Sequence, residues 1–160
     1  MTTTKKSSRS PISLHARALV LLARREHSRR ELAQKLARHA TPDDDVPALL
    51  DTLEERKLLS EARFVEARVS TLAKRYGSAR ITRDLAQRGV TRDATKRAGI
   101  VARTTDLARA RDVWQRRFGV QPSDALERAK QMRFLATRGF PFEVIQKLIG
   151  KGAVAGESDD

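Results

Sequence analysis

The chain has 160 residues and a formal net charge of +13, with 33 Lys and Arg against 20 Asp and Glu. Cysteine is absent, which excludes disulfides and thiolate metal sites. The longest apolar run, residues 18–23, is too short to span a bilayer and leads into arginines rather than a cleavage site. We therefore expect a cytoplasmic protein with no membrane segment.

The charge is unevenly distributed along the chain. Residues 62–104 hold eleven basic and three acidic side chains, a balance of +8. Residues 41–61 hold seven acidic and two basic side chains, a balance of −5. A basic stretch beside an acidic one favours a polyanion, or an acidic protein surface, as the partner.

The first predicted module spans residues 13–59. Residues 1–12 before it are polar and aperiodic, and we expect them to be a disordered basic tail. The module's first helix covers residues 13–26, and Ser28 with Glu31 forms a capping box that starts the second. A third helix follows with apolar residues at helical spacing, namely Val46, Leu49, Leu50 and Leu53.

The second predicted module spans residues 60–104 and follows the same plan. Gly77 is predicted to end its first helix, and Gly89 its second, because glycine tolerates the left-handed conformation found after a helix. A weaker third helix carries the predicted buried stripe Ala94, Ala98 and Val101.

The third predicted module spans residues 105–150. Trp114 lies on the stripe of its first helix, and a long second helix runs from Ser123 to Arg138. Pro141 is suited to the first turn of a last helix, and residues 151–160 are expected to be a flexible tail. The aromatic residues that fall outside the predicted core stripes are Phe64, Phe134, Phe140 and Phe142.

The three modules resemble one another. Residues 32–38 align with residues 81–87 at a shift of 49, and residues 85–90 align with residues 135–140 at a shift of 50. A repeat of this length predicts one helical unit used three times, with neighbours stacked to bury a core. We expect an all-α fold of three tandem three-helix repeats in an elongated arrangement, and a monomer.

The residue types of a catalytic or metal site are not assembled in this sequence. No glycine-rich phosphate loop or nucleophile motif is present. His15, His27 and His39 are twelve residues apart, a spacing that does not place them on one helix face. Residues 43–45 are three aspartates, and their place before a helix explains them through the helix dipole. We expect no catalysis, cofactor or bound metal.

The basic residues of the second module are the best candidates for a binding surface. Arg80 and Arg83 are predicted to point away from the Ile81–Leu85 stripe, so that their replacement leaves the core intact. The alternative is that these side chains are solvated faces of stable helices. The candidate residues for binding a polyanion or a partner protein are Arg24, Arg25, Lys74, Arg75, Arg80, Arg83, Arg92, Lys96 and Arg97.

Three segments of the chain carry the motifs of a known family. Residues 18–36, residues 76–90 and residues 133–145, taken in this order and spacing, closely resemble the RecX family. The resemblance implies tandem three-helix repeats that bind RecA and RecA filaments on single-stranded DNA. It further implies inhibition of RecA recombinase, ATPase and coprotease activities in DNA repair and recombination, without catalysis or a cofactor. The basic patch adds an expectation of weak, non-specific DNA binding.

Two other functions fit the same helical pattern. A DNA-binding transcriptional regulator would use one pair of helices as a helix-turn-helix, although the absence of asparagine disfavours direct reading of bases. A helical-repeat scaffold would show no salt-sensitive affinity for DNA.

Overall fold

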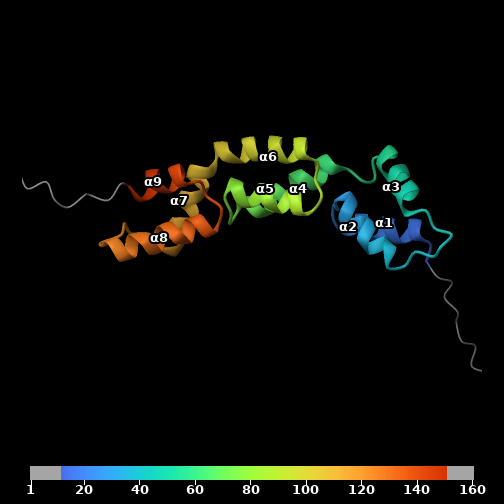
Figure 1. The fold of residues 1–160 in the computed structure, drawn as a ribbon, viewed down its shortest axis with the longest axis horizontal. Helices are drawn as coiled ribbons and strands as arrows, with labels where there is room; N and C mark the ends of the chain where they lie inside the picture. Colours follow the sequence, from blue (N-terminus) through green and yellow to red (C-terminus); the bar gives the residue numbers. More distant parts are fainter. Residues whose placement is uncertain (1–11, 151–160) are drawn as a thin grey trace, which may run out of the picture. The chain divides into compact units, whose positions relative to one another are not determined.

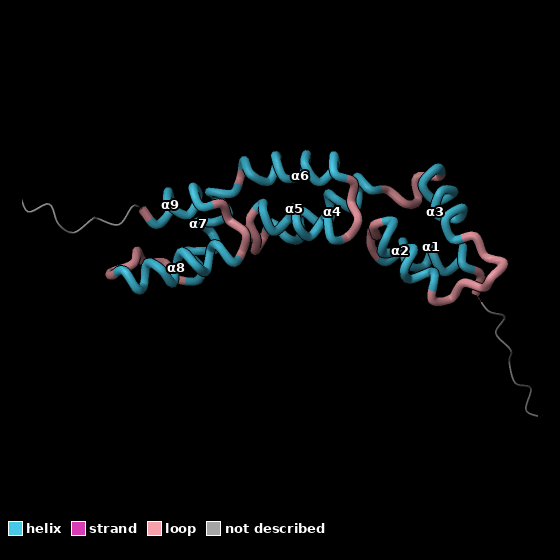
Figure 2. Tube along the Cα trace, in the orientation of Figure 1, coloured by secondary structure: helices cyan, strands magenta, loops and turns pink. Residues whose placement is uncertain are grey.

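The computed structural model describes residues 12–150, and these residues contain nine helices and no strand (Figures 1 and 2). The prediction of an all-α chain with three helices in each module is confirmed. The predicted tails, residues 1–12 and 151–160, lie outside the described residues except for Ile12. The helices are α1 (Leu14–Arg24), α2 (Arg29–Ala37), α3 (Val46–Glu55), α4 (Glu61–Ala73), α5 (Ser78–Gln87), α6 (Arg92–Thr104), α7 (Asp106–Arg117), α8 (Ala125–Thr137) and α9 (Phe142–Ile149).

The described residues divide into two compact units, residues 12–61 and residues 62–150. The first unit holds α1 to α3, and the second holds α4 to α9. The elongated arrangement of all three repeats stays a prediction. None of the helices between residues 12 and 150 has the length and hydropathy that a bilayer-spanning segment needs.

The first unit has a leucine-rich core between its three helices. The predicted cap of α2 is present, since Ser28 Oγ accepts a hydrogen bond from the Glu31 N–H at 3.1 Å. The aspartates before α3 also act locally: Asp45 Oδ1 accepts from the Ala48 N–H at 3.0 Å, and Asp44 accepts from Thr41. The buried core residues are Ala18, Leu32, Leu36, Leu50, Leu53 and Leu59.

Two expectations about the core of the second module were wrong. Phe64 of α4 is 2% exposed and packs in this core, although it had been placed off the stripe. Val101 of α6 is 67% exposed, and Ala102 is the buried residue at that turn. One residue of helix rotation separates the two positions by about 100°. The buried set is Phe64, Leu72, Ile81, Leu85, Val90, Ala94 and Ala102.

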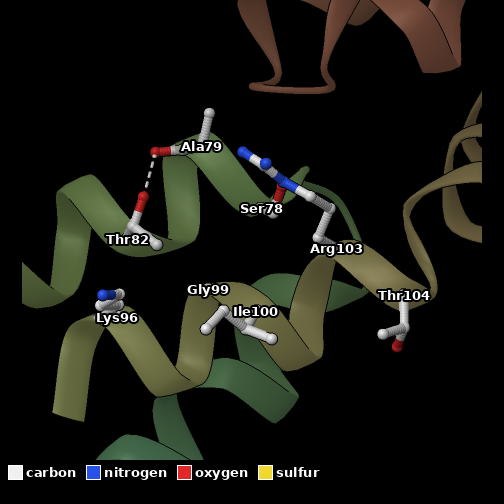
Figure 3. Close-up of a pocket in the computed structure, with 8 residues that line it drawn as sticks. All are labelled: Ser78, Ala79, Thr82, Lys96, Gly99, Ile100, Arg103 and Thr104. Carbon is white, nitrogen blue, oxygen red and sulfur yellow. Dashed lines mark hydrogen bonds between the residues drawn. The ribbon is translucent and has the colours of Figure 1, made fainter. Parts of the chain in front are cut away.

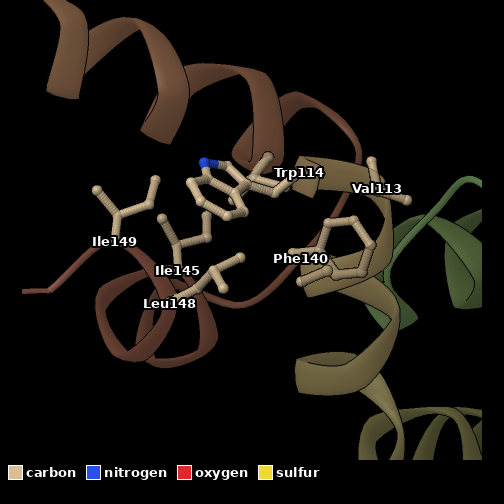
Figure 4. Close-up of a cluster of buried hydrophobic side chains, with 8 residues drawn as sticks. Val113, Trp114, Phe140, Ile145, Leu148 and Ile149 are labelled. Atoms are coloured by element: carbon tan, nitrogen blue, oxygen red, sulfur yellow. The ribbon is translucent and has the colours of Figure 1, made fainter. Parts of the chain in front are cut away.

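The third module packs α7, α8 and α9 around Trp114 (Figure 4). Figure 4 shows the Trp114 ring facing Ile145, Leu148 and Ile149 of α9. The indole N–H is satisfied, because Trp114 Nε1 donates to Oε1 of the buried Gln131 at 2.7 Å. Phe140 is also buried, at 4% exposure, although it lies on none of the predicted helix stripes.

The second and third modules are joined by a backbone contact between two glycines. The N–H of Gly77 donates to the Arg138 carbonyl at 2.8 Å, and the N–H of Ala79 donates to the Gly139 carbonyl at 3.2 Å. A Cβ on Gly77 would lie 2.3 Å from the Gly139 oxygen, closer than atoms can pack. Gly77 is therefore the N-cap of α5 at a close approach, and α4 has already ended at Ala73, so its predicted role as a helix stop was wrong.

The predicted stop at Gly89 is confirmed, and Gly139 ends α8 in the same way. Gly89 and Gly139 follow α5 and α8 with φ of 79° and 84°. After each one the chain folds back, because the Val90 N–H donates to the Leu85 carbonyl and the Phe140 N–H donates to the Leu135 carbonyl. This is the glycine-terminated helix end predicted from the repeat.

Candidate nucleic-acid interface

Every basic residue proposed from the sequence is exposed in the structure, but the nine belong to different units. Arg24 and Arg25 end α1 in the first unit, and the other seven lie in the second. Arg25 is engaged locally, since its Nη1 lies 3.1 Å from Glu31 Oε2 and donates to the Glu26 carbonyl at 2.8 Å. Arg25 is therefore less available to a partner than its exposure suggests.

Lys74 and Arg75 line a hollow of about 550 Å³ in the second unit, which we call the junction hollow. The hollow lies where the end of α4 meets α7 and α8. It brings five basic side chains together, and no acidic residue lines it. The lining residues are Lys74, Arg75, Tyr76, Val113, Arg116, Arg117, Phe134 and Arg138.

Arginines of the third module dock on the carbonyls just after α4. Arg116 Nη2 donates to the Lys74 carbonyl at 3.1 Å, and Arg138 Nη1 donates to the Arg75 carbonyl at 3.5 Å. Arg109 donates to the Tyr76 carbonyl. Cations are favourable at the negative end of a helix dipole, so these arginines help to join the modules. A guanidinium has five N–H donors, and these contacts leave donors of Arg116 and Arg138 for a ligand.

Aromatic rings hold two of the guanidiniums in place. Arg138 lies over the Phe134 ring at 4.5 Å from its centroid, and Arg80 lies over the Tyr76 ring at 4.1 Å. Such cation–π contacts restrict a long, flexible side chain. Planar guanidiniums that are already oriented suit phosphate oxygens, which accept two hydrogen bonds from one arginine.

Arg80 and Arg83 line a second hollow of about 400 Å³, between α5 and the end of α8. Asp84 also lines this hollow, and it accepts two hydrogen bonds of 2.7 Å from Arg68 and one of 3.0 Å from Arg88. The hydrogen bonds from Arg68 are the main reason that the pKa of Asp84 lies below its ordinary value. The carboxylate is thus paired within the protein rather than opposing a bound anion.

Arg80 is more closely tied to the fold than the sequence indicated. Its guanidinium covers Tyr76 and donates to the Thr137 carbonyl at 3.5 Å, and its backbone N lies 2.6 Å from where a Cβ on Gly139 would stand. The expectation that Arg80 can be replaced without disturbing the core stays a prediction, but its replacement would remove the contacts with Tyr76 and Thr137. Arg83 has no such role in the described contacts of α5, so it is the cleaner position to change.

The remaining predicted cations lie on α6. Lys96 lines a third surface depression, between α5 and α6. Arg92 and Arg97 are exposed and line none of the three depressions described here. The structure thus distributes the predicted cations of the second unit over three surfaces.

The third-module arginines Arg116, Arg117 and Arg138 were missed by the sequence reasoning. A signal for two of them was present, because the first helix of each module ends at a basic pair. Arg24 with Arg25 ends α1, Lys74 with Arg75 follows α4, and Arg116 with Arg117 ends α7. The stacking of successive modules brings the second and third pairs to one hollow.

The histidines are placed apart from this surface. His27 is 1% exposed; its Nδ1–H donates to the Arg25 carbonyl and its Nε2 accepts from Lys35 Nζ, both at 3.0 Å. Its hydrogen bonds are thus used inside the first unit. Between residues 12 and 150, no three His, Asp or Glu side chains are grouped as ligands for a metal ion.

Comparison with known proteins finds the same three modules. Models of the first, second and third three-helix domains of RecX match residues 15–53, 60–98 and 104–149. The chain belongs to the RecX family. Its similarity to solved structures agrees with this fold: it superimposes on RecX from Lactobacillus salivarius with a TM-score of 0.72 at 19% identity, over 85% of this chain and 92% of the other.

Bacterial relatives named regulatory protein RecX share about half of the residues. The chain is 51% identical to the protein of Herminiimonas arsenicoxydans over 84% of this chain and 89% of the other. It is 48% identical to that of Leptothrix cholodnii over 89% and 91% of the two chains. It is 46% identical to the protein of Ralstonia nicotianae over 95% of this chain and 96% of the other. The RecX family is one of regulatory proteins, and its match extends over all three modules.

Proposed function

We propose that this protein binds RecA and RecA filaments on single-stranded DNA, and that it restrains RecA recombinase, ATPase and coprotease activities in DNA repair and recombination. Membership of the RecX family supports the choice of RecA. The junction hollow is the observation that carries the binding mode, because it concentrates five cations and no acid at one place. A RecA–DNA filament is polyanionic, so such a surface is attracted to it. The proposed regulator is a cytoplasmic monomer without catalysis or a cofactor.

The central experiment is inhibition of RecA ATP hydrolysis on single-stranded DNA. We expect the full chain to inhibit, and the double variant Lys74→Glu/Arg117→Glu to inhibit at least about tenfold less well, because reversed charges at a contact oppose binding. Both side chains are exposed, so the variant should lose no more than about 0.5 kcal/mol of stability per site.

Two controls separate this contact from a general loss of charge. Arg111→Glu reverses an exposed cation on α7, the helix that carries Arg117, but outside the junction hollow. Asp43→Lys changes the acidic turn without touching the Asp44 and Asp45 caps. Both should inhibit nearly as well as the parent. A double variant that inhibits as the parent does would place the contact elsewhere, and a parent without effect on RecA would refute the proposed function.

A further inference from the structure

The depression between α5 and α6 differs in chemistry from the junction hollow. It has a volume of about 450 Å³, and Figure 3 shows α5 and α6 running side by side, with lining residues on both helices. We call it the α5–α6 groove. Its lining residues are Ser78, Ala79, Thr82, Lys96, Gly99, Ile100, Arg103 and Thr104.

The floor of this groove is apolar. Thr82 Oγ1 donates to the Ala79 carbonyl at 3.0 Å, and Thr104 Oγ1 donates to the Val101 carbonyl at 2.7 Å, so each hydroxyl is satisfied within its own helix. Gly99 allows α5 and α6 to approach closely at the floor, because a Cβ there would lie 2.6 Å from the Thr82 methyl carbon. Ile100 is 61% exposed beside it.

The edges of the groove are basic. Lys96 and Arg103 both line it from α6, seven residues apart, which corresponds to about 10 Å along the helix axis. Among the described residues, neither makes an ion pair with a carboxylate, and no acidic side chain lines the groove. An apolar floor between two unpaired cations suits a ligand with an apolar group between two anions.

We propose that the α5–α6 groove binds an acidic segment of a partner protein. An apolar side chain of that segment packs on Gly99 and Ile100, and carboxylates on either side, about 10 Å apart, pair with Lys96 and Arg103. Exposed apolar surface rimmed by polar groups is typical of protein-binding sites. A nucleic-acid strand would leave the apolar floor without a contact. A second copy of this chain would be repelled, because each copy has a net charge of +13.

This proposal rests on the proposed function in taking RecA as the protein that presents the acidic segment. It assigns the protein contact to the groove and leaves phosphate contacts to the junction hollow. The two surfaces therefore differ in how they respond to substitution. Loss of the groove weakens binding to RecA filaments but leaves the affinity of the free protein for single-stranded DNA unchanged.

A matched pair of substitutions on α6 tests the apolar floor. Ile100→Ser removes the floor residue, whereas Val101→Ser removes its neighbour, which is 67% exposed and does not line the groove. The probe is a RecA filament assembled on oligothymidylate, with the affinity of each full-length variant measured by light-scattering titration or surface plasmon resonance. We expect Ile100→Ser to weaken binding about tenfold and Val101→Ser to change it less than about twofold.

A second pair tests the basic edge. Lys96→Glu reverses a groove cation, and Arg97→Glu reverses the adjacent exposed cation of α6, which does not line the groove. Only the first should weaken filament binding more than about tenfold, while both should bind free oligothymidylate equally.

Each outcome bears on a different statement. If the parent binds the filament and Ile100→Ser binds as tightly as Val101→Ser, the groove is not the protein contact, although the proposed function stands. Equal loss of free DNA affinity in the Ile100→Ser variant would also overturn the proposal, as would a parent dimer in light scattering that Ile100→Ser dissociates. A parent that does not bind RecA filaments at all refutes both the proposed function and this inference.

Discussion

Two buried polar residues, Asp106 and Gln131, show how individual side chains stabilise this fold. Asp106 is fully buried and accepts from the Ser78 N–H at 3.0 Å, from Ser78 Oγ and from Arg109 Nη2 at 2.6 Å. Gln131 joins Trp114 to the Val120 carbonyl. Because buried polar groups cost free energy unless they are hydrogen-bonded, each of these residues fixes the position of its partners.

His27 gives the first unit a pH-dependent stability. Burial is the main reason that the pKa of His27 lies below its ordinary value of 6.5. As the pH falls, the imidazole of His27 therefore takes up a proton in the unfolded chain at a pH at which it is still neutral in the folded unit. The free energy of unfolding consequently falls as the pH drops below about 6.5. Stability is complete above that pH and decreases down to the lower pKa of the folded state.

Amide hydrogen exchange at residues 14–55 between pH 7.5 and pH 5, corrected for intrinsic exchange rates, would measure this loss in the first unit. His27→Gln removes the titrating group and should flatten the pH dependence in this range. An unchanged pH dependence in the variant would show that another group is responsible.

The burial of His27 could not be predicted from sequence patterns. Its position just before α2 places it on no helix face, so periodicity says nothing about its environment. Phe64 and Phe140 were missed for a different reason, because each is buried in a core that several helices form together. Caps with a local partner were predictable, as Ser28 with Glu31 shows, because both groups lie within four residues.

At the scale of elements, the junction between the second and third modules depends on close backbone approach at Gly77. We expect Gly77→Ala to lower the free energy of unfolding of the second unit by about 2–4 kcal/mol, because the added methyl meets backbone atoms that cannot rotate away. Urea denaturation followed by Trp114 fluorescence measures this, since Trp114 lies in the adjoining core.

Gly150→Ala is the matched control. Gly150 has a φ of 75°, but a Cβ there meets nothing within 4 Å. Its replacement therefore carries only the cost of a backbone conformation that favours glycine, φ 75° with ψ 161°, which is about 1–3 kcal/mol. A smaller loss at Gly77 than at Gly150 would contradict the role given to the junction.

Helices were predictable from the sequence, and the surfaces between them were only partly so. The repeat located all three modules because apolar spacing and glycine stops are local signals. The junction hollow combines Lys74 with Arg117 and Arg138, which are far apart in the chain. No local pattern indicates that these residues lie close together. The sequence-based prediction therefore included the cations of the second module but not those of the third.

At the scale of the whole molecule, the net charge of +13 predicts weak, salt-sensitive binding to single-stranded DNA. Affinity should fall with salt between about 50 and 200 mM, and each phosphate contact on a single strand contributes about −0.7 to the slope of log K against log salt. Lys74→Gln and Arg117→Gln should each reduce that slope by about 0.7, whereas Arg111→Gln should not. Fluorescence anisotropy of a labelled oligothymidylate gives the slopes. An affinity that does not change with salt concentration would contradict the prediction.

The backbone pairing of Gly77 with residues 138 and 139 has a consequence for how the protein is made. The start of α5 lacks its carboxylate partner until Asp106 has been synthesised, and its glycine contact until Gly139 has emerged. At about 5–20 residues per second, the ribosome takes roughly 3–12 s to add the intervening residues. During that interval all residues of α1 to α3 have been synthesised, whereas the start of α5 still lacks the residues that it contacts in the third module.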